Sequence, residues 1–175
     1  MTISKLEAAR RQTDEAIVLF FNDRDPLAIV TLVHAAQTLL TDLSEAKGGA
    51  TLHATFKSFV VPGKEGELRR ALNKLPNFLK HADNDPHDTI DEPPPKYNDG
   101  GLAWCCTYYQ DLAGSMTPTM HVYFAWFAML NPSIIKPEYP QAAIAALNGG
   151  NFARMDRKDQ LDVGRRLLGP SAARR

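Results

Sequence analysis

Residues 25–49 read DPLAIVTLVHAAQTLLTDLSEAKGG, and this stretch decides the fold because its apolar residues recur at helical spacing. Asp25 and Pro26 are typical of a helix N-cap and first helical turn, and Gly48-Gly49 is typical of a helix end. The stretch therefore predicts an amphipathic helix over Pro26–Leu43 that buries one face. The residues of that face are Ile29, Leu32, Val33, Ala36, Leu39, Leu40 and Leu43.

The rest of the chain repeats this pattern on both sides. Helical spacing of apolar residues predicts further helices, in chain order, over Lys5–Phe21, Glu65–Ala82, Leu102–Leu112, Pro118–Leu130, Pro140–Leu147 and Asp156–Leu168. Pro76 lies inside the third of the predicted helices and must kink or split it. Thr117 and Pro118 are expected to cap and begin another helix. We expect two loops, an ambiguous one over residues 50–63 and a long one over Asp83–Gly101.

Length and composition set the class of protein. The 175 residues are 44% hydrophobic and 23% charged, which is typical of one globular domain. We predict an all-α, single-domain bundle of six or seven helices over residues 1–170, followed by a frayed basic tail over 171–175. Because 20 basic residues balance 20 acidic ones, net charge gives no overall reason to bind nucleic acid or membranes.

Cysteine usage and the N-terminus indicate a compartment. The adjacent Cys105 and Cys106 are predicted to be small buried residues of a helix in a reducing environment. The N-terminus has no apolar core of a signal peptide, and the most apolar run, Met120–Leu130, is about half the ~20 residues that cross a bilayer. We therefore expect a cytoplasmic protein without a membrane partner.

The helix predicted over Glu65–Ala82 carries the clearest candidate site. At about 100° per residue, Arg70, Lys74, Asn77 and His81 fall on one face, opposite the apolar stripe that includes Leu72 and Leu75. Arginine and lysine hold phosphate groups, asparagine orients them, and histidine acts as an acid or base near neutral pH. A solvent-exposed helix face, where these residue types are routine, is the more common explanation of such a pattern.

Two other groups of polar residues accompany this face. His81, Asp83, Asp85 and His87 fall within a short segment at the helix exit and could hold a divalent cation, although helix capping by Asp85-Pro86 is the favoured interpretation. His34 lies on the polar side of its helix with Thr31, Thr38 and Thr41. We expect His34 to face His81 across a groove, with a plain surface histidine as the alternative. No cofactor other than such a cation is indicated.

Two further clusters are assigned structural or weak roles. The aromatic residues Tyr108, Tyr109, Tyr123, Phe124, Trp126 and Phe127 are expected to be core. The C-terminal quarter is basic but is interrupted by Asp156, Asp159 and Asp162, so it predicts nucleic-acid binding only weakly. The basic residues in question are Arg154, Arg157, Lys158, Arg165, Arg166, Arg174 and Arg175.

The segment Leu75–Pro86, LPNFLKHADNDP, resembles a motif of short bacterial proteins of unknown function, Asn-Phe-x-Lys-His-Ala-Asp-x-Asp-Pro. More distantly it resembles HEPN domains, helical bundles that often dimerise and include many RNases. The HEPN signature is an arginine, then a polar residue such as asparagine, then three residues and a histidine. Asn77 and His81 match its polar and histidine positions, whereas Pro76 stands where the arginine is expected, which argues against RNase catalysis.

The first resemblance implies no activity, whereas the resemblance to HEPN domains implies a homodimer that binds RNA or a nucleotide. In this interpretation His81 is the acid or base, Asn77 is the orienting donor, and Arg70 and Lys74, with Lys80 and His34 nearby, bind the ligand. A non-catalytic interaction or regulatory bundle is the first alternative function. A metal-dependent hydrolase that uses His81, Asp83, Asp85 and His87 is the second.

Overall fold

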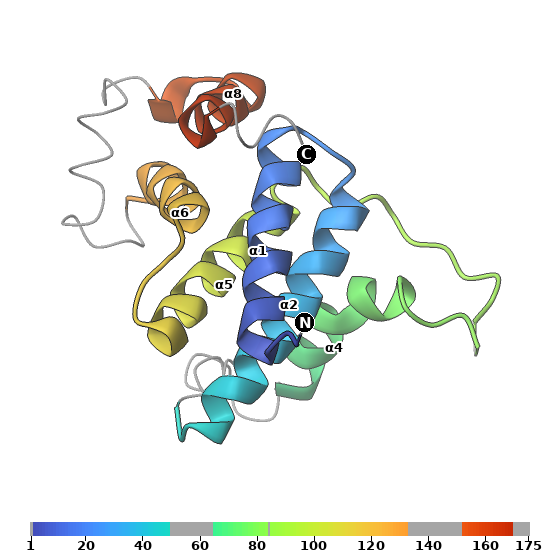
Figure 1. Ribbon diagram of the computed structural model, residues 1–175. Helices are drawn as coiled ribbons and strands as arrows, with labels where there is room; N and C mark the ends of the chain where they lie inside the picture. The colour runs from blue at the N-terminus through green and yellow to red at the C-terminus, as the bar shows by residue number, and fades with distance from the viewer. Residues whose placement is uncertain (1, 50–64, 84, 133–151, 170–175) are drawn as a thin grey trace.

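The structure is a computed structural model that describes residues 2–49, 65–83, 85–132 and 152–169 (Figure 1). These residues form six α-helices and one 3-10 turn and contain no strand, so the predicted all-α bundle is confirmed. The loop predicted over 50–63, the helix predicted over Pro140–Leu147 and the tail predicted over 171–175 lie outside the described residues.

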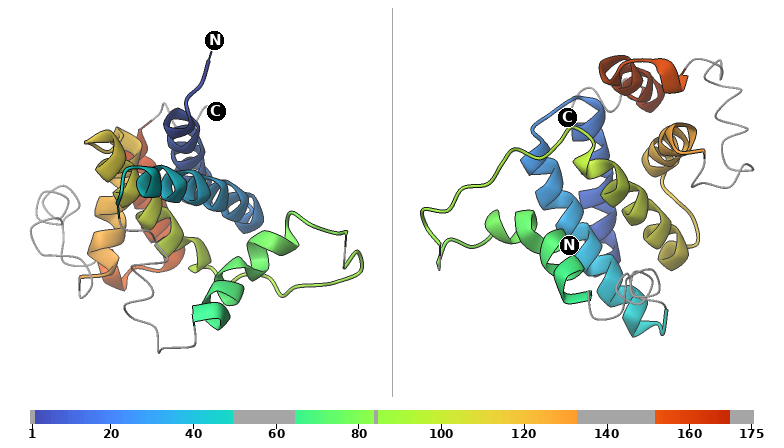
Figure 2. Two further views of the ribbon diagram at one scale, coloured as in Figure 1. Left: turned by 90° about the horizontal axis from the view of Figure 1, so that it is seen from below. Right: turned by 180° about the vertical axis from the view of Figure 1, so that it is seen from behind.

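Helices α1 (Lys5–Phe21) and α2 (Pro26–Ala46) form an antiparallel pair at the centre of the bundle (Figures 1 and 2). Ser4 caps α1, because its Oγ accepts a hydrogen bond from the Glu7 backbone at 3.1 Å. Asp25 caps α2 in the predicted way, its Oδ1 accepting from the Leu27 backbone at 2.7 Å. The four-residue connection between the helices forces them to lie side by side.

Helix α5 (Tyr97–Ala113) begins five residues before the predicted Leu102, inside the stretch predicted to be a loop. Gly100 and Gly101 both lie inside this helix, and Gly101 allows close packing against α2. A Cβ on Gly101 would lie 2.9 Å from Cγ1 of Val33, so only glycine fits against α2 at that point. The buried Asn98 donates a hydrogen bond to the Pro26 carbonyl at 3.2 Å. Contacts with α2 therefore extend α5 beyond what local propensity favours.

Helix α6 (Pro118–Leu130) and helix α8 (Arg157–Leu168) complete the core on one side of α1 (Figure 1). Tyr123 and Trp126 of α6 are fully buried and pack against Phe20 and Phe21 of α1 at ring-centroid distances of 5.3 to 5.8 Å. The short 3-10 turn η1 (Phe152–Arg154) adds Phe152 to this cluster. The prediction that the aromatic residues form core is confirmed for these positions, as is the burial of both cysteines.

Arg157 joins α8 to the core and is not part of a basic surface, which corrects its sequence-based grouping. Its guanidinium lies over the rings of Phe20 and Trp126, 5.1 and 4.9 Å from their centroids. Two hydrogen bonds, of 2.6 and 3.0 Å, connect the same group to both carboxylate oxygens of Asp99 in α5. The planar guanidinium group of arginine can donate both of these hydrogen bonds at once, and the Asp99 carboxylate compensates its charge.

Helix α4 (Glu65–Phe78) lies at the edge of the bundle beside α2 (Figure 2). Leu75 is buried at 5% exposure, but Leu72 is 46% exposed, so the predicted burial of Leu72 is wrong. His34 of α2 is hydrogen-bonded to Asn73 of α4 and to Lys80 of the turn after it. Asn73 lies about a quarter turn from Leu72 on α4. A polar side of α4 thus contacts the bundle, and part of the apolar stripe is left outside.

Helix α2 is also, among the described residues, the one helix long and apolar enough by length and composition to cross a membrane. It packs against α1 and α5, the position of a core helix, and core helices pass the same test.

Replacing Thr117 by alanine tests the local chemistry that begins α6. The Thr117 hydroxyl accepts from the Met120 backbone at 3.1 Å and donates to Asp14 of α1 at 2.6 Å. We expect Thr117→Ala to lower the free energy of unfolding by about 1–2 kcal/mol, because an N-cap and a link between helices are lost together. Urea denaturation measures this loss. Thr119→Ala, two residues later and inside α6, is the control. An equal loss of stability in Thr119→Ala would contradict the capping role of Thr117.

Candidate functional site

The candidate site is built where α4 ends. Pro76 has no backbone N–H, yet the chain keeps a helical turn beyond it, because the Lys80 and His81 backbones both donate to the Asn77 carbonyl at 3.0 Å. This turn holds His81 one turn after Asn77, as the predicted face requires. The predicted split at Pro76 is wrong, because α4 continues through Pro76 to Phe78, where the helix ends four residues before the predicted Ala82.

A pocket of about 410 Å³ lies beside this turn. Its volume is within the range of roughly 300–1,000 Å³ that small-molecule sites occupy. The pocket brings together five of the predicted site residues, while Arg70, Lys80, His34 and His87 are outside its lining. The lining residues are Lys74, Asn77, Phe78, His81, Asp83, Asp85, Asp88 and Ile90.

The predicted metal ligands are not assembled into a cation site. Asp83 and Asp85 line the pocket with His81, but His87 does not. Within the described part of the chain, no group of three or more histidine, cysteine, aspartate or glutamate side chains is placed to hold a metal ion. The pocket instead mixes three carboxylates with a lysine, an amide and an imidazole, a donor and acceptor set suited to an organic polar ligand.

A second polar arrangement lies on the α2 side of α4. Lys80 Nζ is 2.8 Å from Nδ1 of His34, and Nε2 of His34 is 3.2 Å from Oδ1 of Asn73. Because an ammonium group can only donate, Nδ1 must accept and Nε2–H must donate to the amide oxygen. His34 was predicted to face His81, but its ring nitrogens bond to Lys80 and Asn73, while His81 lines the pocket.

The surroundings of His34 favour its neutral form. Partial burial lowers the pKa of its imidazole from the ordinary value of 6.5, and the positive charge of Lys80 lowers it further. The hydrogen bond to Asn73 opposes this shift. Near neutral pH the imidazole is therefore an uncharged acceptor that fixes the direction of the Lys80 ammonium.

Several cations of the bundle pair with carboxylates, whereas those on α4 and the turn after it do not within the described residues. Arg10 and Arg11 pair with acids on α1, and Arg157 pairs with Asp99. Over the described ranges, Arg70, Lys74 and Lys80 are exposed or at the pocket edge and form no ion pair within 4.0 Å. Their charge remains available for an anionic ligand.

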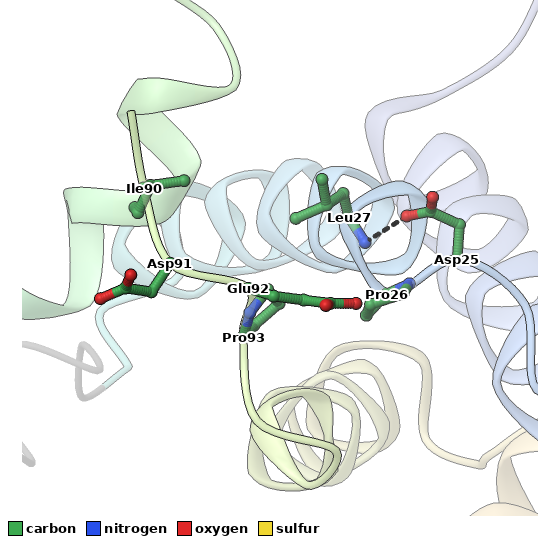
Figure 3. Close-up of a pocket in the computed structure, with 7 residues that line it drawn as sticks. All are labelled: Asp25, Pro26, Leu27, Ile90, Asp91, Glu92 and Pro93. Atoms are coloured by element: carbon green, nitrogen blue, oxygen red, sulfur yellow. Dashed lines mark hydrogen bonds between the residues drawn. The ribbon is translucent and has the colours of Figure 1, made fainter. Parts of the chain in front are cut away.

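A smaller pocket of about 200 Å³ lies at the start of α2, where the chain passes from Ile90 to Pro93 (Figure 3). The Asp25 carboxylate already satisfies the N-terminal backbone of α2, and the Glu92 side chain points toward Pro26 (Figure 3). Asp91 points away from them. Because the helix N-terminus is capped and the lining is acidic, this pocket does not suit an anion.

Sequence reasoning missed Asn73, and it named Lys80 only as one of several binding residues. The signal was a spacing of seven residues, which would place Asn73 and Lys80 two turns apart on one side of the helix predicted over Glu65–Ala82. Their convergence on His34, 39 and 46 residues earlier in the chain, needs the packing of α4 on α2 and could not be read from the spacing alone.

Comparison with known proteins found no match with which this site could be compared. No protein-family model, no curated protein and no solved structure matches the chain.

Proposed function

We propose that the protein binds RNA or a nucleotide at α4 and the turn that follows it. The observation that carries this proposal is a set of cations on α4 and the turn after it that have no carboxylate partner among the described residues, namely Arg70, Lys74 and Lys80. Phosphate oxygens are the acceptors that such a set of lysine and arginine side chains favours.

The pocket beside the cations supports a nucleotide over a simple anion. Asp83, Asp85 and Asp88 would repel a bare phosphate placed among them, but they can accept hydrogen bonds from ribose hydroxyls or base N–H groups. Lys74 at the pocket edge would contact the phosphate of the same ligand. Asn77 and His81 complete the lining as orienting donor and as acid or base.

The test is fluorescence anisotropy with a labelled single-stranded oligouridylate, with uridine monophosphate as a competitor. We expect Lys74→Met and Lys80→Met each to weaken RNA binding by about tenfold, because each removes one charge-assisted hydrogen bond to phosphate. The negative slope of the logarithm of the binding constant against the logarithm of the salt concentration should become less steep by about 0.7 for each lysine removed.

Lys158→Met is the matched control, because Lys158 is an exposed lysine on α8, outside the proposed site. Its affinity and salt slope should equal those of the wild type if α4 is the binding surface. Absence of RNA and nucleotide binding by the wild type, or equal losses in all three variants, would refute the proposal.

A partner-docking role is the second candidate, favoured by the exposure of Leu72 in the middle of α4. The homodimer expected from the sequence would be one such use of this face. Leu72→Ser separates the two functions, because it leaves the cations in place. RNA affinity that survives this substitution together with loss of self-association would assign the apolar residue to docking and the cations to RNA.

A further inference from the structure

His34 occupies the place where α4 is joined to the bundle. Its helix, α2, packs against α4, and the imidazole bonds to Asn73 of α4 and to Lys80 of the turn that follows α4. The ring is half-buried, whereas Lys80 is exposed beyond it. A half-buried, oriented imidazole therefore holds a cation that faces solvent.

Lys80 gains a defined position from this contact. A solvent-exposed lysine has many rotamers, and binding an anion in one of them costs conformational entropy. The 2.8 Å hydrogen bond to Nδ1 of His34 uses one of the three ammonium donors and leaves two for a ligand. Because imidazole is neutral, it orders the ammonium without cancelling its charge, which a carboxylate would do.

We propose that His34 is a positioning residue for Lys80 and that protonation of His34 releases this lysine and weakens the binding of a phosphate-bearing ligand. The ligand part of this inference rests on the proposed function, whereas the coupling between His34 and Lys80 does not.

The acid response follows from the donors and acceptors. Protonated Nδ1 cannot accept a hydrogen bond, and an imidazolium would then lie 2.8 Å from an ammonium. Of the described residues, Lys80 is the charged group that acts on His34, and the other contact from α4 is the neutral Asn73. Helices α1 and α5 also pack against α2 but bring no charge to the ring in the described ranges.

The pH range follows from the direction of the shift. The pKa of His34 is lowered from 6.5 in the folded protein, so the unfolded chain binds more protons as the pH falls below that value. The contact is therefore complete above pH 6.5 and is lost as the pH falls through the lowered pKa.

The first experiment follows the ring nitrogens of His34 by NMR in the ligand-free protein. We expect a neutral Nε2–H tautomer at neutral pH and an increase in the pKa of His34 in Lys80→Met, because the neighbouring charge is gone. Lys74→Met, which removes an exposed cation that does not contact His34, should leave that pKa unchanged. An unchanged pKa in Lys80→Met would overturn the coupling.

The second experiment measures oligouridylate binding between about pH 5 and 8, the range in which histidine titrates. The wild type should lose about tenfold in affinity across this range through release of Lys80. His34→Gln keeps an acceptor oxygen without a titrating group, so its affinity should depend less on pH than that of the wild type. His34→Phe should bind weakly throughout.

The outcomes separate the two proposals. Binding with the same pH profile in the wild type and His34→Gln would overturn the inference and leave the proposed function standing. Absence of binding by the wild type at every pH would overturn the proposed function, and the NMR titration would still decide whether His34 and Lys80 are coupled.

Discussion

Arg157→Ala is expected to lower the free energy of unfolding by about 3 kcal/mol, because it removes one partner of a partly buried, hydrogen-bonded ion pair. The Arg157 and Asp99 side chains are only 22% and 13% exposed, and two hydrogen bonds join them. The guanidinium also packs over the rings of Phe20 and Trp126. The substitution therefore leaves an uncompensated carboxylate and removes the contact that fixes α8 to α5 and the aromatic core.

The pH dependence of this loss gives a second measurement. Burial raises the pKa of Asp99 from 3.8, and Arg157 opposes that shift. Without Arg157 the pKa should rise further, so folding of the variant should favour the protonated carboxyl. The difference in stability between wild type and variant should therefore narrow as the pH falls toward the Asp99 pKa.

Urea denaturation followed by circular dichroism measures both effects. Arg165→Ala is the matched control, because Arg165 lies on the same helix and pairs with Asp162 while 46% exposed, where such pairs contribute less than about 1 kcal/mol. A cycle with Asp99→Asn isolates the pair itself. Similar losses in the two arginine variants would show that Arg157 acts as a surface residue.

Helices that depend on local chemistry could be predicted from the sequence. Asp25-Pro26 and Thr117-Pro118 each supply an N-cap oxygen and a residue that suits the first turn, and α2 and α6 begin there. The core aromatic residues of α6 were predicted for a similar reason, because their spacing and apolar character mark them wherever the partner helices lie.

Features that depend on tertiary contacts could not be predicted in this way. The start of α5 at Tyr97 rests on the fit of Gly101 against Val33 of α2. The role of Arg157 depends on Asp99, 58 residues earlier in the chain. Among the neighbouring charges of the basic C-terminal quarter, nothing in the sequence distinguishes the one that turns inward.

The residues of the candidate site also fall into a group set by local geometry and a group set by tertiary contacts. Asn77 and His81 are one turn apart, so helical geometry alone places them in one pocket with Lys74. The contact of His34 with Lys80 arises because polar residues of α4 and of the turn after it meet α2, whereas the apolar stripe is buried only in part, at Leu75 but not at Leu72. Sequence periodicity identifies which residues share a face, and packing decides which face is inward.

Gly164→Ala is the second substitution with a large expected effect. Its expected change in the free energy of unfolding is opposite in sign to the change that helix propensity predicts. Alanine in place of an interior helical glycine normally stabilises by about 1 kcal/mol. At Gly164, however, a Cβ would lie closer than 3.0 Å to three ring carbons of Phe21. That ring is 1% exposed and packs edge-on against Phe20 and Trp126, so it cannot turn aside. We expect a net loss of about 3 kcal/mol in the free energy of unfolding.

Two companion variants make this prediction specific to the contact between α8 and α1. Gly100→Ala has nothing within 4 Å of its new Cβ and should follow helix propensity, with a gain of about 0.5–1 kcal/mol. Phe21→Leu shortens the side chain that Gly164 accommodates, so the double variant Gly164→Ala with Phe21→Leu should be more stable than the sum of the single losses predicts. Additive losses of stability in thermal and urea denaturation would mean that α8 does not pack against Phe21 at Gly164. A positive coupling would show that this glycine is required because the helix approaches the aromatic core too closely for any side chain.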